Sequence, residues 1–510
     1  KINFNSKIIL PVVSYLLALI LNGCAGTIPK EPSWAETTLQ TLSLREKIAQ
    51  MMVSYMNMRF KDIPKAKWDE INSLITSDGI GSVHLWYGDA GSSITMMNEM
   101  QSASNIPILF NADIEYGLNQ RFPFGTDLPP LMAIAATGNP DNAYQVGKII
   151  AEEARVVGIH WNLSPVVDVN NNPLNPIINT RSFGEDPDVV STFGISLMKG
   201  LQENGVLATA KHFPGHGDTE TDSHSSLAMI PSDSARLWSV EIPPFQAMSD
   251  AGVDAIMVAH VHAPDYQVES ETPASMTPFW IQTILREKLG FNGVVITDAM
   301  GMGGISKNYS DNYALIKTIN AGSDVIIQNY NLKKSIDTVE KAVLDGVIPI
   351  NRINESALKV LKMKERVGLH KSFHISLEGF YNKYNNKEHK KIAEEIGKEL
   401  ALRKIKIIYG GANVGLMGLM ADEALKNKGE VIGVALKSFK KWNILHKKIT
   451  KLYLVNTLQK RKELMYKKSD AFIVLPGGIG TIDEVFEVIA TNILTKSNKL
   501  LILLNYKNFW

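Results

Sequence analysis

The chain has 510 residues, an ordinary apolar content of 45% and a formal net charge of +1. This length exceeds the size to which one hydrophobic core normally grows, which excludes a single small domain and favours two domains or a barrel with an added module. The near-neutral total conceals two unlike segments: residues 371–510 hold 23 Lys, 2 Arg and 13 acidic residues, a net charge of +12, which leaves −11 for residues 1–370. Segments so different in charge predict two domains.

The N-terminus has the order of a secretory signal peptide. Lys1 and Lys7 lead into an apolar run, Ile8–Leu21, that is too short for a membrane-spanning helix and is followed by the small residues before Cys24. Cys24 is the only cysteine, so an internal disulfide is excluded, and its setting resembles the lipobox of bacterial lipoproteins. We therefore expect residues 1–24 to direct export and Cys24 to carry a lipid anchor on a periplasmic or cell-surface protein. A buried cysteine in an uncleaved helix is the alternative.

The next segments predict a tether and a barrel. Residues 25–38 are rich in Pro and small residues and show no clear period, as a tether does. Between residues 39 and 370, short β-branched and apolar runs alternate with helical stretches, which predicts a parallel sheet closed into a (β/α)8 TIM barrel. The predicted strands are Met51–Met56, Gly81–Trp86, Ile108–Asp113, His160–Val166, Leu207–Phe213, Ala255–His260, Val294–Asp298 and Asp324–Gln328.

Several of these strands end in ionisable residues. Asp113, the pair Lys211 and His212, His260 and Asp298 all stand at carboxyl ends. In (β/α)8 barrels these ends form the mouth of the active site, so the residues are candidates for chemistry.

The loop after the fifth strand carries the densest group of candidates. Residues 211–217 read KHFPGHG, and five residues later the same loop gives Asp222, Ser223 and His224. A carboxylate two residues from an imidazole can orient the ring and fix its tautomer, as a general acid/base requires. A metal site built from the histidines and Asp222 is the alternative, although the helical H-x-x-x-H spacing is missing.

The whole stretch 211–224, KHFPGHGDTETDSH, resembles the signature of bacterial β-N-acetylglucosaminidases in glycoside hydrolase family 3. The resemblance implies that His224 is the acid/base and Asp222 its partner. Residues 111–122, with NADIEYG and QRF, resemble the segment whose Asp and Arg hold sugar hydroxyls, which maps those roles onto Asp113 and Arg121. Two further blocks, LSPVVDV at 163–169 and RSFG at 181–184, match as well. They add Arg181 as a sugar-binding residue, and Lys211 and His212 are likewise implied as contacts to the sugar.

Asp298 follows the apolar run VVIT at residues 294–297. The family resemblance implies that Asp298 is the nucleophile, and an ionised carboxylate can attack the anomeric carbon to give a covalent glycosyl-enzyme with overall retention of configuration. Without the resemblance, a helix N-cap is an equally good reading of an Asp at this place.

The Lys-rich second segment predicts a linker over residues 371–386 and a partial Rossmann-like domain over 387–510. Two strands, Ile405–Tyr409 and Ala471–Leu475, each run into a glycine loop and a helix, an arrangement that offers backbone N–H groups to a phosphate. The loop glycines are Gly410, Gly411 and Gly415 in the first unit and Gly477, Gly478 and Gly480, with Thr481, in the second.

These two loops resemble the cytokinin riboside 5′-monophosphate phosphoribohydrolase family, often labelled lysine decarboxylases. The resemblance implies that Arg461, in RKELM, and Glu484, in PGGIGTIDE, act on the N-glycosidic bond of a nucleoside monophosphate. No apolar first strand is found before Lys387, so the predicted domain is partial.

Taken together, the sequence predicts an exo-acting, retaining β-N-acetylglucosaminidase that hydrolyses peptidoglycan fragments or related oligosaccharides. No metal or organic cofactor and no nucleic-acid partner are expected, and a nucleoside monophosphate is the ligand expected at the second domain. A β-N-acetylglucosaminide phosphorylase is an alternative, because a histidine acid/base repels phosphate less than a carboxylate does. A broad β-glucosidase is another. A lipid-anchored sugar-binding protein is the alternative from another class.

Overall fold

The computed structural model describes the chain except residues 1–30, 59–64, 89, 123–124, 232, 268–270, 328–330, 372–374, 376–386, 414, 438–444, 476–478 and 505–510. The predicted signal peptide and Cys24 lie outside the described residues. Within those that are described, no helix combines the length and the apolar character needed to cross a membrane.

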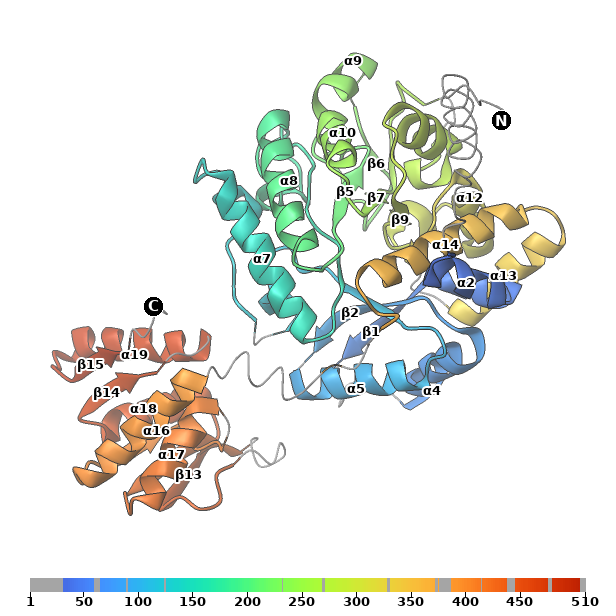
Figure 1. Cartoon of the computed structure of the whole chain (residues 1–510). Helices are drawn as coiled ribbons and strands as arrows, with labels where there is room; N and C mark the ends of the chain where they lie inside the picture. Colours follow the sequence, from blue (N-terminus) through green and yellow to red (C-terminus); the bar gives the residue numbers. More distant parts are fainter. Residues whose placement is uncertain are drawn as a thin grey trace, which may run out of the picture.

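Eight parallel strands form a closed barrel (Figure 1). One sheet has the order β10-β1-β2-β3-β4 and another the order β5-β7-β9. Single bridges, Trp161 with Leu207 and Ile296 with Val325, join the two sheets into a ring. The strands are β1 (Met52–Met58), β2 (Ser82–Gly88), β3 (Leu109–Ala112), β4 (Trp161–Asn162), β5 (Thr209–Phe213), β7 (Ala255–Val258), β9 (Val294–Thr297) and β10 (Ile326–Ile327). Each coincides with a predicted strand, which confirms the (β/α)8 architecture.

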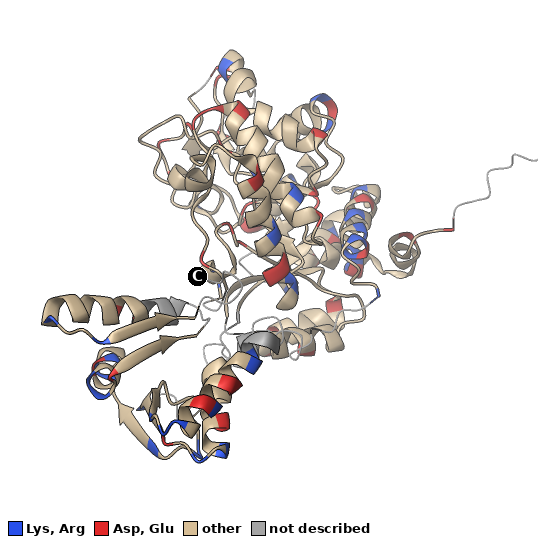
Figure 2. Ribbon diagram, turned by 60° about the vertical axis from the view of Figure 1, so that its left-hand side comes forward, with Lys and Arg blue, Asp and Glu red and all other residues tan. Residues whose placement is uncertain are grey.

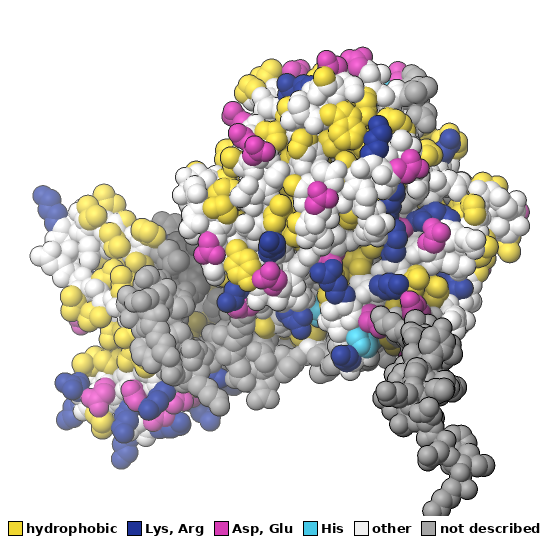
Figure 3. Space-filling view, turned by 45° about the horizontal axis from the view of Figure 1, so that its top comes forward, with side chains coloured by type: hydrophobic (Ala, Val, Ile, Leu, Met, Phe, Trp, Pro, Cys, Tyr) yellow, Lys and Arg dark blue, Asp and Glu magenta, His cyan; other side chains and the backbone are white. Residues whose placement is uncertain are grey.

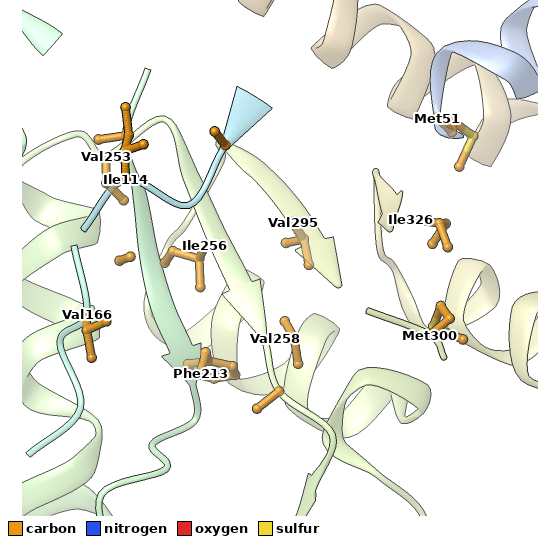
Figure 4. Close-up of a cluster of buried hydrophobic side chains, with 14 of the residues drawn as sticks. Met51, Ile114, Val166, Phe213, Val253, Ile256, Val258, Val295, Met300 and Ile326 are labelled. Atoms are coloured by element: carbon orange, nitrogen blue, oxygen red, sulfur yellow. The ribbon is translucent and has the colours of Figure 1, made fainter. Parts of the chain in front are cut away.

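Alternating side chains of the strands fill two separate cores. In β7, Ile256 and Val258 join the large cluster between strands and helices, which Figure 4 shows in part, whereas Ala255 and Met257 point into the barrel. This alternation follows from the two-residue period of a strand. Both faces are apolar because helices cover the outside, as is typical of parallel sheets.

In the helices around the barrel, apolar residues recur with the 3.6-residue period of a helix, so that they lie on one face. The longer α-helices are α4 (Lys65–Ser73), α5 (Ala90–Ala103), α7 (Pro140–Val156), α8 (Pro187–Gln202), α10 (Pro243–Asp250), α12 (Asp311–Ala321), α13 (Leu332–Leu344) and α14 (Ile350–Arg366). Residues of α14, among them Val360 and Met363, close the barrel interior at the end opposite to the predicted site.

The predicted tether over residues 25–38 is wrong in its last part. Helix α2 (Trp34–Thr41) begins there, with Ser33 and Glu36 forming a capping box. Ala35 and Leu361 are buried together where α2 packs on α14. A helix of about two turns is too short to show a clear hydrophobic period, which is why composition pointed to a tether.

The predicted linker over residues 371–386 is also wrong at Ile375. Its backbone N–H donates to Asn98 Oδ1 at 2.8 Å, and its carbonyl accepts from Asn98 Nδ2 at 2.9 Å. The Ile375 side chain is buried and lies so close to Gly158 that a Cβ there would be 2.1 Å from Ile375 Cδ1. This residue therefore belongs to the barrel. The other residues of 372–386 lie outside the described part of the chain.

The second domain is an α/β fold with sheets of its own. Strands β11 (Ile407–Tyr409), β12 (Val431–Leu436) and β13 (Lys451–Val455) form one parallel sheet, and β14 (Ala471–Val474) and β15 (Leu500–Leu503) form another. The helices are α16 (Lys387–Leu402), α17 (Gly415–Lys426), α18 (Leu458–Lys468) and α19 (Ile479–Thr495). The two predicted strand-to-helix units are β11 with α17 and β14 with α19. Figure 2 shows charged positions of both signs along the helices of this domain.

Large apolar side chains are exposed on part of this domain. On α19, Phe486 is 65% and Leu494 82% exposed, and in β15 Leu500 is 59% exposed. Figure 3 shows apolar side chains gathered on the second domain, at the left of the view. The barrel strands have no such exposure among the described residues.

Candidate active site

A cavity of about 560 Å³ lies at the carboxyl ends of the barrel strands. It is lined by seven of the eight residues predicted for the first domain, and the eighth, Asp222, is paired with one of them. The seven are Asp113, Arg121, Arg181, Lys211, His212, His224 and Asp298. The structure thus brings together residues that are up to 185 positions apart in the sequence.

Asp298 follows β9 directly and is held by the backbone. Its N–H donates to the Val258 carbonyl at 3.1 Å, and its Oδ1 accepts from the N–H of Ala299 at 2.7 Å. The nearby helix α11 (Gly303–Ser306) has Met302 at its N-cap position without a side-chain hydrogen bond. The N-cap alternative for Asp298 is therefore wrong, and its second carboxylate oxygen is left for the cavity.

The surroundings of Asp298 favour its ionised form. Burial by itself would raise the pKa of this carboxyl, but the neighbouring His212 and His260 and the Ala299 N–H outweigh burial and lower the pKa. An ionised carboxylate at physiological pH is the state that a nucleophile needs.

His224 and Asp222 form the predicted pair. His224 Nδ1 lies 2.7 Å from Asp222 Oδ1, which also accepts from the His224 backbone N–H at 2.9 Å. Because a carboxylate only accepts, Nδ1 carries a proton, and Nε2 is the atom that can exchange a proton with substrate. The His224 side chain is 59% exposed, so it can reach a leaving group at the cavity mouth.

The loop that carries this pair is anchored on both sides. The carbonyls of Ser223 and His224 accept from the N–H groups of Gly304 and Gly303, at 3.2 and 2.9 Å. A Cβ on Gly303 would lie 2.3 Å from the Ser225 carbonyl oxygen, so only glycine permits this approach. On the other side, Ser223 Oγ lies 2.9 Å from His216 Nε2. The pair is thereby tied to the loop after β9, next to Asp298.

A compact group of charges lines the remaining wall. Lys211 Nζ bridges Asp113 Oδ1 at 2.8 Å and Glu115 Oε1 at 2.7 Å. Arg181 binds Glu115 through two hydrogen bonds, of 3.0 and 2.8 Å. Buried charges are tolerated when they are paired in this way. Lys211 and Arg181 are thus fixed in position. The cationic atom nearest to Asp113 Oδ2 is a guanidinium nitrogen of Arg121, at 3.6 Å.

The pKa values follow from this pairing. Burial would raise the pKa of Asp113, but the charge of Lys211 outweighs burial and holds the pKa at about 2. Lys211 and Arg181 hold the pKa of Glu115 well below its usual range against the same effect of burial. Both carboxylates are therefore ionised and act as hydrogen-bond acceptors only.

An aromatic surface completes the cavity. The Arg121 guanidinium lies 3.9 Å from the centre of the Trp86 ring, and the Tyr55 ring stacks on His84 at 5.3 Å between centroids. Cation–π contact keeps a guanidinium in place without neutralising it. Arg121 therefore remains available for a polar substrate.

Three further functional residues were missed in the sequence. Asp168 is buried and accepts from the Nδ1–H of His212 at 2.7 Å and from the His216 N–H at 2.7 Å. Glu115 organises the cations, and His84 lines the cavity. Asp168 and Glu115 both stand in the motif blocks quoted above, each two residues past a predicted strand, so strand-end position was the signal that could have found them. His84 lies inside a strand and gave none.

The metal alternative is not supported by the arrangement of ligands. In the described part of the chain, no group of three or more His, Cys, Asp or Glu residues is placed to hold a metal ion. His216 instead contacts the hydroxyls of Thr219 and Ser223, at 2.6 and 2.9 Å.

The second domain brings Arg461, Glu484 and Gly410 together. Arg461 NH1 lies 2.7 Å from Glu484 Oε1, and Arg461 Nε donates to the Val434 carbonyl at 3.0 Å. A Cβ on Gly410 would be 2.2 Å from Arg461 NH2, so this glycine makes room for the guanidinium. Gly411 and Gly415 have positive φ values of 75° and 66°. Gly477 and Gly478 lie outside the described residues, and Gly480 and Thr481 fall in the first turn of α19.

An ionised carboxylate, a His–Asp pair and a cluster of paired charges meet at the mouth of a parallel barrel, which defines a (β/α)8 fold with a candidate active site at the strand ends. The chain belongs to glycosyl hydrolase family 3: residues 43–363 match the model of the family's N-terminal domain. Residues 417–510 match a second model, described as possible lysine decarboxylase. Both resemblances expected from the motifs are thereby confirmed.

Two relatives match much of this chain in sequence. The chain is 30% identical over 373 residues to a β-N-acetylglucosaminidase/β-glucosidase of Cellulomonas fimi, covering 71% of this chain and 65% of that one. It is 33% identical over 330 residues to β-hexosaminidase A of Pseudoalteromonas piscicida, covering 58% and 55%. The chain thus spans less than two thirds of the length of these relatives.

Solved structures show the same fold. A family 3 β-N-acetylglucosaminidase from Paenibacillus sp. str. FPU-7 superposes with a TM-score of 0.61 at 26% identity, covering 90% of this chain and 98% of that one. A β-glucoside phosphorylase superposes with a TM-score of 0.65 at 24% identity, covering 83% and 89%.

Proposed function

We propose that the barrel is a retaining exo-β-N-acetylglucosaminidase that acts on peptidoglycan fragments or related oligosaccharides. The observation that carries this proposal is the presence of Asp298 and the His224–Asp222 pair at one cavity of about 560 Å³. Family membership and the relatives named β-N-acetylglucosaminidase and β-hexosaminidase support it.

The residues divide the reaction between them. In the first step the Asp298 carboxylate attacks the anomeric carbon while the Nε2–H of His224 protonates the leaving oxygen. In the second step neutral His224 takes a proton from water, which attacks the same carbon and releases Asp298. Asp222 accepts from Nδ1–H throughout, which keeps the ring oriented and stabilises its charged form. Two inversions give retention.

The sugar is held by the paired charges. Asp113 accepts from hydroxyls, Arg121, Arg181 and Lys211 donate to hydroxyl or carbonyl oxygens, and His212 is a further contact to the sugar. Because these groups are pre-oriented by Glu115 and Asp168, they lose little freedom on binding.

An assay of the purified chain tests the proposal. Aryl β-N-acetylglucosaminide and aryl β-glucoside are compared with and without inorganic phosphate, and the anomer of the first product is followed by NMR. Release of β-N-acetylglucosamine, with a clear preference over the glucoside, is expected. A sugar 1-phosphate as the main product would instead identify a phosphorylase, equal rates on both glycosides a broad β-glucosidase, and binding without turnover a sugar-binding protein.

We propose further that the protein is exported and held at the membrane by acylated Cys24. The order of Lys1 and Lys7, the apolar run Ile8–Leu21 and the small residues before Cys24 supports this location. Cys24→Ser is expected to move the protein from the membrane fraction to the soluble fraction. A wild-type protein that is soluble and keeps residues 1–23 would contradict the anchor.

For the second domain we propose a nucleoside monophosphate as ligand. The Arg461–Glu484 contact beside Gly410 supports it, because a guanidinium next to a glycine loop suits a phosphate. Calorimetric titration with AMP tests it, with Arg461→Ala expected to abolish any heat of binding. An Arg461→Ala chain that binds AMP as the wild type does would contradict the site.

A further inference from the structure

His84 is a buried cavity residue to which the sequence motifs assign no role. It lies in β2, is 3% exposed, and lines the same cavity as Asp113. A polar side chain so deeply buried normally has a partner for each polar atom. The two ring nitrogens of His84 differ in this respect.

One nitrogen is used inside the protein. Nδ1 lies 2.8 Å from Asn111 Oδ1, and the ring stacks on Tyr55 with an interplanar angle of 18°. Because a carbonyl oxygen only accepts, Nδ1 carries the proton. Burial lowers the pKa of His84, so the ring is neutral at physiological pH and Nε2 has a lone pair to offer.

The other nitrogen faces Asp113. Nε2 is 3.7 Å from Asp113 Oδ2, which is beyond hydrogen-bonding distance. Both atoms are hydrogen-bond acceptors, so neither can donate to the other. Two acceptors side by side can instead bind a ligand that has two neighbouring donors. A pyranose ring supplies such donors as hydroxyls on adjacent carbons.

We propose that His84 is a substrate-binding residue whose Nε2 accepts a hydrogen bond from the sugar hydroxyl adjacent to the one that Asp113 holds. The proposal rests on the proposed glycosidase function and extends it: the site recognises a pair of free neighbouring hydroxyls on the terminal sugar. A substituent on either hydroxyl would place a non-donor against two acceptors, which adds a reason for action at unsubstituted chain ends.

His84→Phe tests this role because it keeps a ring against Tyr55 and removes both nitrogens. The substrates are aryl N-acetylglucosaminide and its 3-deoxy, 4-deoxy and 6-deoxy analogues. We expect the wild type to lose about 10-fold in kcat/KM on the analogue that lacks the contacted hydroxyl. On the parent substrate, His84→Phe is expected to lose kcat/KM by the same factor. On the analogue that lacks the contacted hydroxyl, His84→Phe should show no further loss. His84→Gln, which can still present an acceptor, should recover part of the loss.

His160→Phe is the matched control. Its Nδ1 also contacts an oxygen, the Gly158 carbonyl at 2.9 Å, but it precedes β4 at the other end of the barrel, and it does not line the cavity. The ratios of kcat/KM between the parent substrate and each deoxy analogue should be the same for His160→Phe as for the wild type. Thermal unfolding of each variant separates a folding defect from a binding defect.

Equal factors of loss for His84→Phe on all four substrates, or no loss at all, would overturn the proposal. Activity of the wild type on the parent glycoside reports separately on the proposed function. If the wild type failed to cleave the parent glycoside, the affinities of N-acetylglucosamine and its deoxy analogues, measured by calorimetry, would provide the same comparison. A His84→Phe chain whose relative affinities for these sugars equal those of the wild type would again refute the role of His84.

Discussion

The two domains differ in how completely their polar groups are paired and their apolar side chains are buried. In the barrel, both faces of the strands are covered, and Lys211 is bonded to two carboxylates although only 3% of its side chain is exposed. In the second domain, β14 and β15 leave Ile473 and Leu500 42% and 59% exposed. Parallel sheets are normally covered on both faces, so the barrel has the features of a self-sufficient unit and the second domain does not.

The barrel's site depends most strongly on Asp298. Asp298→Ala is expected to lower kcat at least about 10³-fold, because it removes the proposed nucleophile. The measurement is turnover of an aryl β-N-acetylglucosaminide, with circular dichroism to confirm folding. Asp298→Ala should regain part of its activity in azide, which can attack in place of the carboxylate. Near-wild-type turnover without azide would exclude Asp298 as the nucleophile.

The loss of activity on replacing His224 should be larger for substrates with a poorer leaving group. A poor leaving group needs the proton, so His224→Ala is expected to lose about 10²-fold or more on a natural disaccharide and far less on a nitrophenyl glycoside. Asp222→Asn, which keeps the shape of the pair, should give the same trend with smaller losses. If His224→Ala slowed both substrates equally, His224 would be a structural or binding residue and not the general acid.

Much of this site could be predicted from the sequence because it follows strand ends. Asp113 and Asp298 come directly after apolar runs, and a parallel barrel brings all such ends to one mouth. The role that we propose for His84 could not be predicted, because it depends on Asn111 in β3 and on Asp113 just after that strand. The pairing register that aligns β2 with β3 is not visible in the sequence. Glu115 depends in the same way on Arg181, 66 positions away.

The fold was predictable to a similar degree, and the prediction failed at segments whose place is set by contacts with distant parts of the chain. The alternation of short apolar runs with helical stretches predicted all eight barrel strands, whereas α2 and Ile375 became part of the barrel through packing on α14 and α5. Those contacts join residues more than 270 positions apart, and no local period encodes them.

A buried lysine should make the barrel's stability depend on pH. Lys364 in α14 is fully buried with the Gln50 side chain as a hydrogen-bond partner, and burial lowers its pKa to about 7. The unfolded chain holds this proton up to about pH 10.4. Between these two values the unfolded state binds more protons, so the contribution of Lys364 to stability rises with pH from about 7 to 10 and is at its most unfavourable below pH 7.

Lys364→Met removes that dependence. We expect the variant to be about 2 kcal/mol more stable than the wild type at pH 6.5 and the difference to shrink towards pH 10, measured by urea unfolding. Lys362→Met, on the same helix with 52% of its lysine side chain exposed, is the control and should change little at any pH. A difference that is constant with pH would show that Lys364 is charged in the folded state throughout.

The smallest kinetic effect should come from removing the second domain, provided that the cut lies beyond Ile375. A chain ending near residue 386 keeps the two Asn98 hydrogen bonds and the buried Ile375 side chain, and we expect its kcat/KM on the aryl glycoside to equal that of the full chain. A chain ending at Lys371 loses one buried isoleucine, so it should be about 1–2 kcal/mol less stable and melt a few degrees lower while keeping its activity. Ile375→Ala in the full chain, which keeps the backbone bonds, should fall between the two. Loss of activity in the chain that ends near residue 386 would mean that the second domain contributes to the glycosidase site, and the contrast between a self-sufficient barrel and a dependent second domain would no longer hold.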